Sequence, residues 1–100
     1  MNDLPIACEL TGAELQQRRE TMLEETRRAV TRVEAVKQGF AYYFSSDGDR
    51  LKELANLIDL ERRCCPFLRF SLTVEAGGGQ LILEITGPEG TQEFLRDLFD

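Results

Sequence analysis

A chain of 100 residues with 42% apolar and 30% charged side chains has the composition of a folded protein, and we expect one domain spanning residues 1–100. The net charge of −6 repels phosphate groups, so we expect no nucleic-acid partner. No apolar run reaches membrane-spanning length, and the first ten residues lack a secretory-signal pattern. We therefore expect a cytoplasmic protein without a membrane partner.

The first predicted helix starts near Thr11, which forms a capping-box pattern with Glu14, and extends about five turns into the segment ending at residue 33. Apolar or small side chains recur there at helical spacing and should form its buried stripe. They are Leu15, Met22, Thr26, Ala29 and Val33.

A second helix is predicted over residues 46–64, with Ser46 or Asp47 as its cap. It should end near Cys64, because Pro66 disfavours a helical conformation at Cys65. A short third helix after Pro88 closes the chain. Its predicted inward side chains are Phe94, Leu95 and Leu98.

Two hairpins separate these helices. The first is predicted over residues 32–47, with Gly39 in the turn and aromatic residues alternating over 40–44. In the second, apolar residues alternate on either side of the turn at 77–79. The order (β)αββαββα predicts an α+β fold. It should be a two-layer sandwich with an antiparallel sheet of two hairpins, helices on one face and, at residues 4–10, a fifth edge strand. An exposed sheet edge also favours a homodimer.

Two charged residues lie where apolar residues are expected. Glu61 falls within the apolar stripe of the second helix, one turn before the two adjacent cysteines, and Arg19 falls within the stripe of the first. A buried carboxylate must find a partner or become protonated. We therefore expect a structural ion pair between Arg19 and Glu61, in preference to a catalytic glutamate.

The cysteines are the candidate site. Three cysteines, two of them adjacent, do not form a disulfide framework, so we expect free thiols. Thiolates bind soft ions such as Hg(II) or Cu(I), with Cys64 and Cys65 as ligands and Cys8 as a third. Glu61 and three neighbouring arginines are the expected supporting residues. These arginines are Arg62, Arg63 and Arg69.

Other chemistry is less well supported by the sequence. A closed zinc site normally takes four Cys or His ligands, and the chain has three cysteines and no histidine, so zinc in a monomer is not expected. The absence of histidine also excludes a Cys–His or Ser–His–Asp catalytic arrangement. A redox switch based on the thiols, or an enzyme that uses Glu61 and a cysteine, stays a third alternative.

Residues 61–90, ERRCCPFLRFSLTVEAGGGQLILEITGPEG, resemble a small uncharacterised family of bacterial proteins with the pattern E-R-x-C-C-P-F, an apolar hairpin around glycines, and T-G-P-x-G. Residues 6–19 extend the similarity to most of the chain. Members occur alone or in company with MerR-type metal regulators, which implies a part in heavy-metal response. The family has no assigned activity, so the resemblance carries over no catalytic role. The matching residues are Glu61, Arg62, Cys64, Cys65, Pro66, Phe67, Thr86, Gly87, Pro88 and Gly90.

Two functions follow as expectations. The first is a non-enzymatic thiol protein that binds a soft heavy-metal ion through its vicinal cysteines. The second is a structural or interaction domain, working through a homodimer or a partner surface, in which both cysteines are core residues.

Overall fold

The computed structural model describes residues 12–99, and these residues form an α+β fold. The expected strand at 4–10 and the expected cap at Thr11 lie outside the described residues. The elements follow one another as α1 (Ala13–Ala29), β1 (Val30–Val36), β2 (Gly39–Phe44), α2 (Arg50–Cys64), β3 (Arg69–Val74), the 3₁₀ turn η1 (Ala76–Gly78), β4 (Leu81–Thr86) and α3 (Thr91–Phe99).

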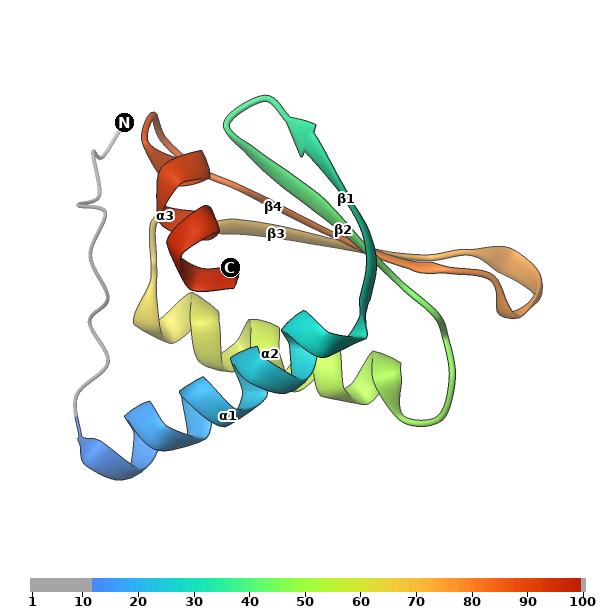
Figure 1. Ribbon diagram of the computed structural model, residues 1–100, viewed down its shortest axis with the longest axis horizontal. Helices are drawn as coiled ribbons and strands as arrows, with labels where there is room; N and C mark the ends of the chain where they lie inside the picture. Colours follow the sequence, from blue (N-terminus) through green and yellow to red (C-terminus); the bar gives the residue numbers. More distant parts are fainter. Residues whose placement is uncertain (1–11, 100) are drawn as a thin grey trace.

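The sheet has the strand order β1-β2-β4-β3, and every neighbouring pair is antiparallel. The two predicted hairpins are therefore joined through the central strands β2 and β4. Figure 1 shows the three helices on one side of this sheet, as the alternation of the strands predicted. Among the described residues, no helix is both long and apolar enough to span a bilayer.

The core lies between the sheet and the helices. Side chains of the two central strands that point toward the helices are buried, and residues from the ends of α2 and α3 close the layer. The largest fully buried apolar side chains of the core are Phe44, Leu54, Leu57, Leu81, Leu83, Ile85 and Leu95.

The first helix has the predicted length of about five turns, but the assignment of Val33 to its apolar stripe was wrong. Helix α1 ends at Ala29, and residues 30–36 form the edge strand β1. This segment is rich in β-branched residues, which favour a strand, and it pairs with the aromatic strand β2. Val33 is consequently 50% exposed on β1, whereas Leu23, which the predicted stripe omitted, is 3% exposed in the core.

The sequence predicted Gly39 in the first hairpin turn. In the structure, Gly39 is instead the first residue of β2. The left-handed conformation in the turn belongs to Gln38, with φ of 59°. A side chain at Gly39 would place its Cβ 1.9 Å from the carbonyl oxygen of Ile85 on β4. Glycine is thus required there by the close approach of the neighbouring strand. In the second hairpin Gly77 and Gly78 do adopt positive φ, as expected.

Helix α2 begins later than predicted and ends where predicted. Its N-cap is Asp49 and not Ser46 or Asp47, and no side chain caps the first turn. Ser46 instead donates a hydrogen bond to the carbonyl of Gly78 at 2.8 Å, which ties the start of α2 to the glycine turn. At the other end Cys65 leaves the helical conformation, with φ −124° and ψ 75°.

Candidate functional site

The two adjacent cysteines lie at the carboxyl end of α2, and both are 0% exposed. The amide of Cys65 still donates to the carbonyl of Glu61 at 2.7 Å, so the chain departs from the helix only after this bond. The change in direction keeps both side chains on the same side. The Cys65 Sγ lies 3.6 Å from the Cys64 Sγ.

The two sulfurs are in different chemical states. Cys64 is disulfide-bonded and has no titrating thiol, whereas Cys65 is a free thiol. The expectation that all the cysteines are free is therefore wrong for Cys64. Cys8, the expected third ligand, lies outside the described residues.

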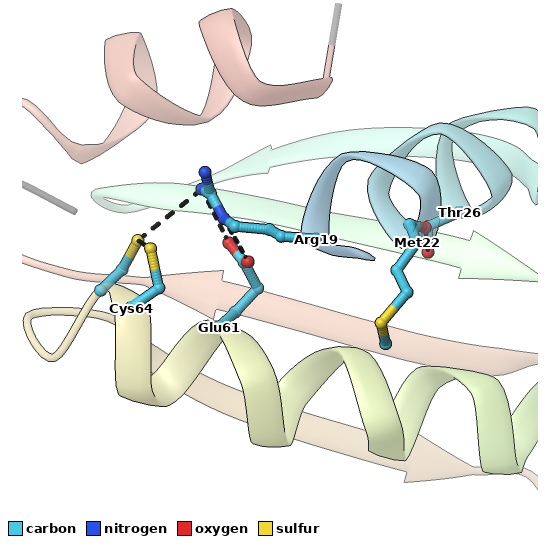
Figure 2. Close-up of polar contacts among 6 residues, drawn as sticks. Arg19, Met22, Thr26, Glu61 and Cys64 are labelled. Atoms are coloured by element: carbon cyan, nitrogen blue, oxygen red, sulfur yellow. Dashed lines mark hydrogen bonds and ion pairs between the residues drawn. The ribbon is translucent and has the colours of Figure 1, made fainter. Parts of the chain in front are cut away.

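A buried ion pair stands beside the cysteines. Arg19 of α1 donates through Nε to Glu61 Oε2 at 2.6 Å and through Nη2 to Glu61 Oε1 at 3.1 Å, a two-point contact between the facing helices (Figure 2). The Glu61 side chain is 2% exposed and the Arg19 side chain 15% exposed. This is the pair that the sequence predicted.

The same guanidinium group reaches the free thiol. Arg19 Nη2 lies 3.9 Å from Cys65 Sγ. Burial raises the pKa of the Cys65 thiol to about 11, the negative charge of Glu61 adds to the increase, and Arg19 opposes it. At neutral pH the Cys65 sulfur is therefore protonated and weakly nucleophilic.

The arginines expected to support the thiols lie elsewhere. Arg62 and Arg63 both bind Asp59 on the exposed side of α2, through contacts of 2.8 and 3.0 Å. Arg69 begins β3 and is exposed. The cation beside the sulfur is Arg19, which the sequence placed on the buried face but did not connect with the cysteines. One signal was present: Glu61 precedes both cysteines by one helical turn, so its partner lies near them.

The number of ligand groups limits metal binding. Within residues 12–99, no cluster of three or more His, Cys, Asp or Glu side chains is arranged to hold a metal ion. Both carboxylate oxygens of Glu61 already accept hydrogen bonds from Arg19. The described part of the site therefore offers two sulfur atoms.

Comparisons with known proteins assign no function to this site. No protein-family model matches the chain, and neither a curated protein nor a solved structure matches it.

Proposed function

We propose that this chain, in its reduced form, is a non-enzymatic thiol protein that binds a soft heavy-metal ion through Cys64 and Cys65. The observation that carries the proposal is the separation of 3.6 Å between the two sulfurs. Two sulfurs at this separation are close enough to contact one ion, because a metal–sulfur bond is about 2.3 Å long. The proposal concerns the reduced protein because Cys64 is disulfide-bonded in the structure.

Charge supports the same site. Binding Cu(I) through two thiolates leaves one net negative charge in a buried region, and the guanidinium of Arg19 lies 3.9 Å from one of the sulfurs. The Cys65 thiol is protonated at neutral pH, so metal must displace its proton.

The test is a competitive titration of phosphine-reduced protein with Hg(II) or Cu(I) in the presence of a low-molecular-weight dithiol, followed by native mass spectrometry. We expect one ion per chain and proton release on binding, measured in weakly buffered solution. The variant Cys64→Ser/Cys65→Ser should lose the ion to the competitor. Retention of the ion by this variant would contradict the proposal.

Two further variants test a third ligand and the cation beside the site. Cys8→Ser reports whether the third cysteine contributes, and Arg19→Met removes the cation beside Cys65 while keeping a long apolar stem. Because the Cys65 thiol is protonated at neutral and lower pH, we expect Arg19→Met to weaken binding by a similar factor throughout that range. An unchanged affinity would mean that Arg19 does not favour the thiolates.

A packing role is the second candidate, and complete burial of both cysteines favours it. Cys64 and Cys65 belong to the same core cluster as Phe67, Leu68 and Leu95. In this case the reduced protein would bind no ion against the dithiol. Cys64→Ala and Cys65→Ala would lower the free energy of unfolding by about 1 kcal/mol or more each, as loss of buried side-chain volume does.

A further inference from the structure

The edge strand β1 has an exposure pattern that the monomer does not explain. In the described chain, its outer edge has no neighbouring strand, because β1 is the first strand in the order β1-β2-β4-β3. Five consecutive residues, 31–35, are exposed, including the large apolar side chain of Val33 at 50%. Unpaired strand edges of this kind are templates for pairing with another strand.

The residues of β1 are self-complementary about Val33. Its sequence, VTRVEAV, carries Arg32 immediately before Val33 and Glu34 immediately after it. In an antiparallel pair of two such strands centred on Val33, Arg32 of each copy faces Glu34 of the other. Opposite charges in facing positions stabilise a pair of strands, and like charges destabilise it.

The two charged side chains are already fixed on one face of the sheet. Arg32 lies over the ring of Tyr43, with its guanidinium carbon 4.1 Å from the ring centroid, and binds Glu34 at 3.1 Å. The Tyr43 hydroxyl donates a hydrogen bond to the Glu34 carboxylate. Less side-chain entropy is therefore lost when a second copy approaches.

The opposite face of β1 supplies apolar contact. Val33 lines a groove with residues of β2 and α3, which are Phe40, Tyr42, Leu95, Arg96 and Phe99. Since β1 contributes Val33 to this lining, Val33 of a second copy would extend the apolar wall. The other sheet edge, β3, carries a single charge within the strand, Arg69, and lacks this complementarity.

We propose that β1 is a homodimer interface, in which two copies pair their β1 strands antiparallel about Val33 and form one continuous eight-stranded sheet. The contact is isologous, so each interface contains the Arg32–Glu34 contact twice. The proposal uses the sheet edge and is independent of the cysteines.

The test measures sedimentation of the reduced protein over a range of concentrations. We expect concentration-dependent dimerisation, accompanied by protection of the β1 amides from hydrogen exchange. Glu34→Arg and Arg32→Glu should each weaken the dimer by about tenfold or more, since two like-charge contacts replace two opposite-charge contacts. Val74→Lys, on the edge strand β3, is the matched control and should leave the dimer unchanged.

Mixing the two single variants distinguishes a change at the interface from a change in the fold. A Glu34→Arg chain and an Arg32→Glu chain have complementary strands, so a mixture should form the heterodimer although each variant alone dimerises poorly. The double variant Arg32→Glu/Glu34→Arg should also recover dimerisation. A wild-type protein that stays monomeric, a mixture that forms no heterodimer, or loss of the dimer in Val74→Lys would each overturn the proposal.

Discussion

Arg19 and Glu61 join α1 to α2 through two hydrogen bonds, and the same guanidinium lies 3.9 Å from Cys65 Sγ. The contact combines two roles. It neutralises a carboxylate that is 2% exposed, and it sets the charge beside the free thiol. The stability of the helix layer and the chemistry of the cysteine site therefore depend on one arginine.

Breaking this pair should destabilise the protein strongly. Arg19→Met leaves Glu61 buried without a counter-charge, and we expect the free energy of unfolding to fall by about 3 kcal/mol in urea denaturation. Arg28→Met is the matched control, because Arg28 on the same helix also contacts a glutamate, Glu24, at 2.6 Å but is exposed. It should change stability by less than about 0.5 kcal/mol. Equal effects of the two substitutions would contradict this account.

A methyl group at Gly39 should be poorly tolerated. Gly39→Ala places Cβ within 1.9 Å of the Ile85 carbonyl oxygen, so β2 and β4 must separate or shift. We expect a loss of about 3 kcal/mol or more in the free energy of unfolding. Gly48→Ala is the comparison: its φ is +57° but nothing lies within 4 Å of the added carbon, and it should cost only about 1 kcal/mol. The order of the two losses checks the close approach of the strands.

Tyr43 should control the ionisation of Glu34 on the open face of the sheet. The hydrogen bond from the Tyr43 hydroxyl lowers the pKa of Glu34, and the charge of Arg32 lowers it further. Tyr43→Phe should therefore raise the Glu34 pKa toward its ordinary value, measured from the carboxyl carbon shift by NMR. Arg32→Gln should raise it by a smaller amount. If Tyr43→Phe leaves the titration unchanged, the hydrogen bond does not persist in solution.

The sequence predicted most of the helices and strands because apolar residues recur every three to four positions in the helices and every two positions in the strands. It assigned Val33 to the wrong element at the junction of α1 and β1, where no glycine or proline separates the two. Val33 fits a helical stripe counted from Leu15 and also fits a strand alternation, and only pairing with β2 decides between them. Gly39 was misassigned for a related reason, since the close approach of β4 is a long-range contact without a local signal.

The site was predictable only in part. Glu61 and Arg19 each lie on the apolar face of their helix, so both were expected to point inward. Their pairing then required only that these two faces pack against each other. Arg62 and Arg63 precede Cys64 directly in sequence, yet each residue along a helix turns by about 100°, which points them toward Asp59 and solvent. Full burial of both cysteines depends on how the layers pack, which periodicity does not determine.

The raised pKa of Cys65 should make stability depend on pH in the alkaline range. Burial raises this pKa from 9.0 to about 11, so above pH 9 the unfolded chain loses the thiol proton while the folded chain keeps it. The contribution of the neutral thiol is thus complete below pH 9 and is lost as the pH rises through 11. We expect the wild-type free energy of unfolding to fall by at most about 2–3 kcal/mol over this interval as a result of this group.

Cys65→Ala isolates the effect, because every other titratable group is present in both proteins. The difference in unfolding free energy between wild type and Cys65→Ala should change with pH only above 9, in the direction that favours the variant. Thiolate absorbance of the folded wild type should appear near pH 11, well above that of the urea-unfolded chain. A thiolate that forms near pH 9 in the folded protein would mean that water reaches Cys65 or that Arg19 outweighs the effect of burial.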